Sequence, residues 1–255
     1  MGGIALNEVE VGMRGLQHDR RYMLVTEQGQ FITQRQTPEL GQFQLSYSTD
    51  ALGFKVDFLG DTLFIPFALA HDSSRMTAQV WDDFVEVQVA SDAINQWFSE
   101  KLNRAVKLVY LPDDSARPVP EKYQPWETST LHVSLADGYP ILIVSEASLS
   151  ELNHRIAESN PQASAMEMQR FRPNLVLDSL EPHQEDDLGT FTLGTTTLQI
   201  TKPCSRCVLT TIHPKTLERG DEPLRTLSTY RKVDNKIIFG ANAICLSPGK
   251  IGLTH

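Results

Sequence analysis

The sequence lacks several features that mark whole classes of protein. It has 3 cysteines in 255 residues, a small and odd number that argues against a disulfide scaffold and is typical of a reducing compartment. No apolar run approaches the roughly 18 residues of a membrane-spanning helix. The N-terminus has no basic region followed by an apolar one, as a signal peptide would have. We therefore expect a cytoplasmic protein that does not associate with membranes.

Positive charge is also scarce. Against 32 Asp and Glu residues there are 23 Lys and Arg residues, which gives a net charge of −9. This balance argues against general nucleic-acid or anionic-membrane binding, but it allows a local basic pocket for a small anion. The sequence contains no phosphate loop, dinucleotide-binding glycine fingerprint or nucleophilic-serine elbow.

Short segments of alternating apolar and polar residues dominate the chain, and this period of two is typical of half-buried strands. The expected strands lie at residues 4–11, 22–25, 31–35, 44–47, 54–58, 62–65, 84–89, 106–111, 131–134, 141–144, 175–177, 190–200 and 237–253. Helical spacing predicts helices at about 92–102, 145–159 and 223–230, with Ser91 and Ser145 as N-caps of the first two. The fold class is therefore expected to be mainly β with a few helices.

A stretch dense in proline and charge, residues 112–120, is the strongest candidate for a domain boundary or a long mobile loop. We therefore expect two domains, residues 1–115 and residues 116–255. Another charged stretch, residues 181–187, is acidic and is expected to be a surface loop.

Two of the three cysteines form a Cys-x-x-Cys pair, Cys204 and Cys207, within the stretch KPCSRCVLTT. Such a pair can be half of a zinc site, a dithiol redox centre or part of a cluster site. Zinc needs two further ligands, which Cys245 and His213 do not supply as a second pair. A dithiol centre would lie at a helix N-terminus, and the β-branched residues after the pair disfavour a helix.

Two interpretations of the cysteine pair stay open. Both thiols can be small buried side chains of a β-protein. Alternatively, one of them is a reactive or metal-binding thiolate, and the intervening Arg206 favours this interpretation because a neighbouring cation stabilises a thiolate.

A second polar group precedes the strand expected at residues 175–177; it consists of Arg170, Arg172 and Asn174. The two guanidinium groups either pair with acids, such as Glu167 or the acidic loop, or face an anion pocket, since arginine suits bidentate phosphate contacts. The run that contains Arg20 and Arg21 allows the same two interpretations. For Arg21 we expect a surface ion pair, because adjacent residues of a strand point to opposite faces.

Four segments together resemble one family. GLQHDRRYMLVTEQGQFITQRQTPEL, LADGYPILIVSEASL, RFRPNLVL and KPCSRCVLTTIHP occur in this order in MOSC-domain proteins that carry the MOSC N-terminal β-barrel domain. The nearest similarity is to the bacterial YcbX type, which is similar to the mitochondrial amidoxime-reducing component of eukaryotes. The resemblance covers almost the whole chain.

The resemblance implies an N-terminal β-barrel-like domain followed by a MOSC β-barrel domain. It also implies the molybdenum cofactor, a molybdopterin that carries an oxo-molybdenum centre, with Cys207 as the single protein ligand of the metal and the catalytic residue. By motif position, the cofactor-binding residues are Arg20, Gly138, Tyr139, Arg172, Asn174 and Arg206. Domain-level similarity further allows pyridoxal phosphate binding.

The activity that the resemblance implies is the reduction of N-hydroxylated compounds to amines or amidines. Electrons would come from an external donor protein, a flavin or iron–sulfur reductase. The family usually has a Pro-x-Lys-Ser motif just before the glycine that aligns with Gly3, and one more hydrophobic strand after the position of Leu253. This sequence lacks both. Because the Lys and Ser of the first motif often assist the cofactor phosphate in the family, we expect one wall of the pocket to be missing.

Two alternatives to an active enzyme follow from the same residues. In the first, Cys207 holds the cofactor or sulfide without turnover, as a carrier or sulfur-transfer protein would. In the second, the chain is a degenerate member of the family that binds no cofactor.

Overall fold

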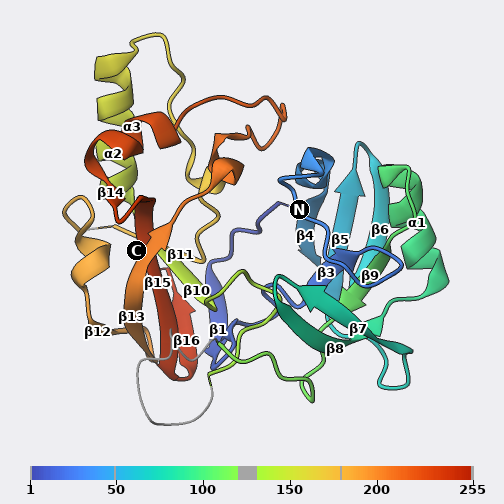
Figure 1. Ribbon diagram of the computed structural model, residues 1–255. Coiled ribbons are helices and arrows are strands. Elements are labelled where there is room, and N and C mark those ends of the chain that lie inside the picture. Colours follow the sequence, from blue (N-terminus) through green and yellow to red (C-terminus); the bar gives the residue numbers. More distant parts are fainter. Residues whose placement is uncertain (1, 49, 120–130, 179, 254–255) are drawn as a thin grey trace. The chain divides into compact units, whose positions relative to one another are not determined.

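The structure is a computed structural model that describes residues 2–48, 50–119, 131–178 and 180–253. It divides into two compact units, which we describe one at a time (Figure 1). The first unit contains the described residues of Met1–Leu6, His18–Gln124 and Thr128–Gly138, and the second contains those of Asn7–Gln17 and Tyr139–His255.

The two units are interleaved along the chain. Asn7–Gln17 belongs to the second unit, because strand β1 (Glu8–Gly12) pairs antiparallel with β16 (Gly249–Gly252) near the C-terminus. The described residues 131–138 belong to the first unit. The predicted division into residues 1–115 and 116–255 differs from these units at both points and stays a prediction.

The first unit is built from two antiparallel sheets. One sheet has the strand order β3 (Tyr22–Val25), β9 (Lys107–Tyr110), β8 (Asp83–Val89) and β7 (Arg75–Val80). The other is a meander of β4 (Gln44–Ser48), β5 (Gly53–Phe58) and β6 (Asp61–Pro66). Alternation along each strand buries one face, and Val56 and Val87 are fully buried in their respective cores.

Helix α1 (Asp92–Leu102) covers part of the core that contains Val56. Its fully buried residue Phe98 lies 5.2 Å from Phe43, measured between ring centroids. Ser91 stands at the N-cap position as predicted, without a side-chain capping hydrogen bond. A short 3-10 helix, η1 (Pro38–Gln42), completes the unit's helices among the described residues.

The second unit centres on a six-stranded sheet. Its strand order is β11 (Leu175–Leu177), β10 (Ile141–Ser145), β15 (Lys236–Ser247), β13 (Thr196–Ser205) and β12 (Thr190–Leu193), with β14 (Lys232–Val233) paired to β15. A smaller sheet has the order β16, β1 and β2 (Gly15–Leu16). The long strands β13 and β15 run antiparallel through the centre, and their pairing is interrupted by register shifts at three points.

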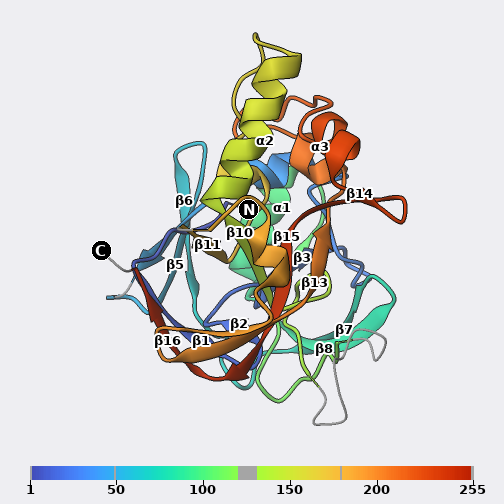
Figure 2. The ribbon, with the colours of Figure 1, turned by 90° about the vertical axis from the view of Figure 1, so that its left-hand side faces the viewer.

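Two helices, α2 (Glu146–Ser159) and α3 (Leu224–Tyr230), lie side by side at one end of this sheet, as Figures 1 and 2 show. The hydroxyl of Ser145 accepts a hydrogen bond from the N–H of Ser148 at 3.0 Å, which confirms the predicted N-cap of α2. Leu152 and Ile156 point into the core from the inner face of α2. Short 3-10 helices lie at η3 (Met168–Arg170), η4 (Gln184–Asp187) and η5 (Val208–Thr211).

The expected fold class is confirmed: the chain is mainly β with a few helices. The strand predicted at residues 31–35 is wrong: only an isolated bridge between Phe31 and Val25 is found there. Strand β7 was not predicted. The predicted acidic surface loop is also wrong at one residue, because the side chain of Glu185 is fully buried. No helix among the described residues has both the length and the apolar character that a membrane crossing requires.

Candidate functional site

The cysteine pair lies where strand β13 ends. Ser205 is the last residue of the strand, and the N–H of Arg206 still donates to the carbonyl of Ile237 on β15 at 2.7 Å. Cys207 follows as the N-cap of η5, with an exposed side chain and an extended backbone at φ −119° and ψ 176°. Its carbonyl accepts hydrogen bonds from the N–H and the hydroxyl of Thr210. The β-branched residues after the pair form a short 3-10 turn, in which Thr210 bonds back to Cys207, and no α-helix follows directly.

The two thiols do not form a matched pair. Cys204 lies within strand β13, whereas Cys207 lies two residues beyond the end of the strand, at the start of η5. Neither thiol forms a disulfide. The described residues also contain no group of three or more His, Cys, Asp or Glu suited to a metal ion. The zinc-site interpretation therefore lacks further ligands among the described residues. The two thiols occupy different settings, since Cys204 is part of the strand and Cys207 has an exposed side chain beyond it.

The third thiol, Cys245, lies on β15 and is fully buried. Burial raises the pKa of this thiol above its ordinary value. Cys245 is therefore a core side chain, as expected for a small buried thiol in a β-protein.

Arg206 is fixed at several points. Its Nη1 donates to the sulfur of Cys204 at 3.3 Å, and its Nη2 donates to the carbonyl of Phe171 at 2.7 Å. The guanidinium carbon lies 5.5 Å from the centroid of the Phe171 ring, within the range of a cation–π contact. The third nitrogen of the guanidinium, Nε, is buried and has no hydrogen-bond partner among the described residues. The arginine expected to assist Cys207 thus contacts the other cysteine of the pair.

Arg170, in the turn before β11, forms a hydrogen bond back to the turn that follows Cys207. Its Nη1 donates to the carbonyl of Thr210 in η5 at 3.3 Å. Burial lowers the pKa of Arg170, and Glu167 acts in the opposite direction. Arg170 and Arg206 therefore join the same two turns reciprocally, and Cys207 lies within the part of the chain that they hold. We call this arrangement the arginine clasp.

Two further predicted residues lie in the same turn region. Arg172 is exposed and has a left-handed backbone with φ 54°. Asn174 is bonded to β10 through both its backbone and its side chain: its N–H donates to Leu142 O at 2.8 Å, and its Oδ1 accepts from Leu142 N at 3.0 Å. The side chain and backbone of Asn174 therefore both join this turn to strand β10.

Strand pairing connects Asn174 with two other predicted segments of the second unit, the one around Tyr139 and the cysteine stretch. Leu142 pairs with Asn242 on β15, and Asn242 pairs with Lys202 on β13. The Nζ of Lys202 lies 5.1 Å from the ring centroid of Tyr139, one residue before Pro140 and strand β10. Asn174, Tyr139 and the start of the cysteine stretch are thus connected across three strands. Lys202 was not predicted as a site residue, although it begins the cysteine motif.

Two predicted residues, Arg20 and Gly138, belong to the first unit. Arg20 has a left-handed backbone with φ 50°, forms an ion pair with Asp19, and accepts at its carbonyl a hydrogen bond from the N–H of Leu135 at 2.9 Å. A Cβ added to Gly138 would have no atom within 4 Å, so packing does not demand glycine there. Their participation in one site with Cys207 stays a prediction.

The neighbouring Arg21 behaves as expected. Its Nη2 lies 2.8 Å from the carboxylate of Asp113, whose side chain is largely exposed. The same guanidinium donates from Nε to the carbonyl of Leu111 at 2.9 Å. The predicted surface ion pair of Arg21 is confirmed.

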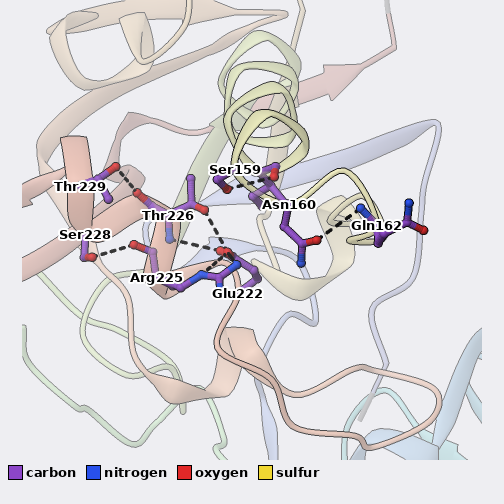
Figure 3. Close-up of polar contacts among 9 residues, drawn as sticks. Ser159, Asn160, Gln162, Glu222, Arg225, Thr226, Ser228 and Thr229 are labelled. Atoms are coloured by element: carbon purple, nitrogen blue, oxygen red, sulfur yellow. Dashed lines mark hydrogen bonds and ion pairs between the residues drawn. The ribbon is translucent and has the colours of Figure 1, made fainter.

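A depression between α2 and α3 is a separate feature of the second unit, lined by Arg155, Glu158, Ser159, Arg225, Thr226 and Thr229. Its polar groups are occupied by their own neighbours (Figure 3). Arg225 and Thr226 both bond to Glu222, and the hydroxyl of Ser159 donates to the carbonyl of Ile156. The depression therefore presents few unused groups to a ligand.

Comparison with known proteins identifies the family. Residues 1–105 match the family described as the MOSC N-terminal beta barrel domain, and residues 130–253 match the family described as the MOSC domain. Mitochondrial amidoxime reducing component 2 of Macaca fascicularis is 29% identical over 91% of this chain and 69% of its own length. Mitochondrial amidoxime-reducing component 1 of Homo sapiens is 28% identical over 98% of this chain and 76% of its own length. Molybdenum cofactor sulfurase of Oryza sativa subsp. japonica is 27% identical over 89% of this chain, which spans only 29% of that relative.

Proposed function

Because this chain belongs to the MOSC-domain proteins that carry a MOSC N-terminal β-barrel domain, we propose that it is a molybdenum-cofactor-dependent oxidoreductase. Its substrates are small N-hydroxylated compounds, which it reduces to amines or amidines. Electrons come from a flavin or iron–sulfur donor protein in the cytoplasm. The observation that carries the proposal is the exposed thiol of Cys207, held within the arginine clasp.

The residues present suit the cofactor. An exposed thiol supplies a soft ligand for molybdenum, and Cys207 offers one outside the core. The pterin phosphate requires cations or N–H donors, and the buried Nε of Arg206 is a donor without a partner among the described residues. When bound, the cofactor would supply the oxygen-atom and electron-transfer chemistry, which no side chain of the protein can supply alone.

The protein's own residues then bind and orient the cofactor. We assign Cys207 as the single protein ligand of the metal and as the catalytic residue. By motif position, the residues that line the pterin and its phosphate are Arg20, Gly138, Tyr139, Arg172, Asn174 and Arg206. Asn174 keeps the turn that carries Arg172 in register with β10 through its two hydrogen bonds to Leu142.

Metal and pterin analysis tests the cofactor assignment. Protein purified from a molybdenum-replete host is expected to contain molybdenum and pterin in stoichiometric amounts. Cys207→Ala is expected to lose the metal, whereas Cys245→Ala is the matched thiol control, because that buried residue lies on β15, away from the turn. Retention of molybdenum by Cys207→Ala would show that the metal assignment is wrong. Absence of both metal and pterin from the unmodified protein would favour a cofactor-free family member.

A second candidate function has support from one observation, the similarity to the plant molybdenum cofactor sulfurase. In that case Cys207 holds cofactor or sulfide for delivery rather than for turnover. The two functions are separated by supplying metal-loaded protein with an aryl amidoxime and an artificial reductant. The oxidoreductase proposal requires catalytic formation of the amidine. Loaded protein that forms none, but transfers cofactor or sulfur to an acceptor protein, supports the carrier.

A further inference from the structure

Cys204 has no role in the proposed function, yet it makes a specific contact. Its sulfur accepts a hydrogen bond from Nη1 of Arg206, while the carbonyl of Phe171 accepts one from Nη2. The Phe171 ring lies beneath the guanidinium. Three groups therefore restrict the orientation of one side chain, and Cys204 is one of them.

Neither hydrogen-bond partner neutralises the positive charge of Arg206. A thiol sulfur and a backbone carbonyl are uncharged acceptors, in contrast to the carboxylates that pair with Arg225 and Arg231 elsewhere in the second unit. Among the described residues, no ion pair of Arg206 is found. The guanidinium therefore retains a charge that can attract an anion.

The donors that Arg206 keeps also point to an anion. Cys204 and Phe171 each accept from one terminal nitrogen, and each of these nitrogens carries a second N–H. Nε is buried without a hydrogen-bond partner among the described residues, and a buried N–H without a partner is costly. Arginine binds phosphate best when its N–H groups are held in a fixed orientation.

The two cysteines occupy different settings. Cys204 lies within β13 and its sulfur contacts Arg206, whereas Cys207 lies beyond the end of the strand with an exposed side chain. Cys204 can therefore affect the site through Arg206, which lies between the two cysteines in the sequence.

We propose that Cys204 is a positioning residue, whose sulfur orients Arg206 so that the guanidinium binds a phosphate group. This inference rests on the proposed function, in which that phosphate belongs to the pterin cofactor. It gives the two cysteines separate roles: Cys207 binds the metal, and Cys204 orients a phosphate-binding side chain.

Calorimetric titration with inorganic phosphate tests the proposal on cofactor-free protein from a molybdenum-free host. Cys204→Val removes the acceptor at similar volume and is expected to weaken phosphate binding about tenfold, the equivalent of roughly 1.4 kcal/mol. Cys204→Ser retains an acceptor and is expected to recover part of the affinity. Cys245→Ala controls for loss of a thiol, and thermal unfolding confirms that each variant is folded.

A double-mutant cycle shows whether Cys204 acts through Arg206. In an Arg206→Lys background, Cys204→Val is expected to cause no further loss of phosphate affinity. Three outcomes would each overturn the proposal. Cys204→Val could bind phosphate as tightly as the unmodified protein, the two substitutions could reduce affinity independently of each other, or the unmodified protein could bind no phosphate.

The metal provides a second measurement that separates this proposal from the proposed function. In molybdenum-loaded protein, X-ray absorption should show one sulfur ligand fewer in Cys207→Ser and an unchanged number in Cys204→Val. A lost sulfur ligand in Cys204→Val would overturn the positioning role. If the protein holds no molybdenum while the phosphate cycle behaves as expected, the proposed function fails and the role of Cys204 stands.

Discussion

Ser145 and Glu185 meet inside the second unit, where the Ser145 hydroxyl donates to the Glu185 carboxylate at 2.9 Å. The backbone N–H of Ser145 also reaches this carboxylate, at 3.3 Å, and the hydroxyl of Ser148 donates to it at 2.8 Å. All three side chains are buried. The carboxylate thus fixes η4 against the N-terminus of α2, where negative charge is also favoured by the helix dipole.

Replacing Glu185 with alanine should therefore destabilise the protein. The change leaves buried hydroxyl groups without their acceptor, and we expect the free energy of unfolding to fall by about 2–4 kcal/mol. Urea unfolding of the variant measures this loss. Asp187→Ala is the matched control on the same 3-10 helix, because Asp187 is exposed, and should change stability by less than about 0.5 kcal/mol. Equal losses in both variants would contradict the structural role of Glu185.

The same pair of residues shows what local sequence patterns can predict. Ser145 was identified as an N-cap because a serine before a helical apolar pattern satisfies the first free N–H groups. Glu185 was assigned to the surface because it lies within an acidic run, and a buried carboxylate requires partners that such a run does not reveal. Its partners lie 37 and 40 residues away, so their proximity depends on the fold.

The candidate site shows the same limit. The segments around Cys207, Arg172 and Tyr139 were chosen by motif. Their connection in the second unit depends on pairing between β10, β15 and β13, including the alignment of Lys202 with Asn242. Alternation indicates that a segment is a strand, but it does not identify the partner strand or the register. Lys202 was missed for this reason, and so was the contact between Arg206 and the carbonyl of Phe171, 35 residues away.

Gly240 is expected to tolerate no side chain. It has φ 73°, and an added Cβ would lie 2.6 Å from the carbonyl oxygen of Ile143. The register between β13 and β15 also shifts here, opposite Pro203 and Ser205. Gly240→Ala should therefore lower the free energy of unfolding by at least about 2 kcal/mol, from the left-handed backbone and the close contact together.

Chemical denaturation measures the effect of Gly240→Ala, and Gly12→Ala provides the control in the same unit. Gly12 lies in β1, has no atom within 4 Å of an added Cβ, and does not have a positive φ. Its substitution should be neutral or slightly stabilising. If Gly240→Ala were as stable as Gly12→Ala, the backbone described at Gly240 would be wrong.

His183 should make stability depend on pH. Burial, and next the guanidinium of Arg231, lower the pKa of His183 below its ordinary value of 6.5, although Glu185 acts in the opposite direction. The folded state then binds fewer protons at this residue than the unfolded state does. The contribution of His183 is fully present above pH 6.5 and is lost as the pH falls through the lowered folded-state value.

Two measurements test this dependence. The ring-proton chemical shift of His183 should titrate with a midpoint below 6.5. His183→Phe keeps a ring beside Tyr230 and Phe239, which His183 contacts at centroid distances of 5.6 and 6.1 Å. The stability of the unmodified protein relative to this variant should decrease as the pH falls below 6.5. A midpoint at or above 6.5 would contradict the prediction, and His18, whose pKa is also lowered, contributes equally to both proteins.

Arg117 is expected to stabilise the first unit from within the proline-rich stretch that precedes the undescribed residues. Its side chain is only 3% exposed, and its Nε donates to the carboxylate of Asp83 at 2.8 Å. Nη1 donates to the carbonyls of Ser134 and Ala136, just before Gly138. Arg117→Met leaves these carbonyls without a donor, so we expect a loss of about 2–3 kcal/mol in the free energy of unfolding.

The control for Arg117 is an exposed arginine of the same unit. Arg75 pairs with Asp114 at 2.6 Å, and both side chains are substantially exposed, so Arg75→Met should cost at most about 1 kcal/mol. Hydrogen exchange gives a local measurement, because the N–H of Leu135 is bonded to the carbonyl of Arg20. That amide should exchange faster in Arg117→Met than in Arg75→Met, since losing the arginine releases the carbonyls on either side of Leu135. Equal exchange in the two variants would show that Arg117 does not hold the segment leading to Gly138.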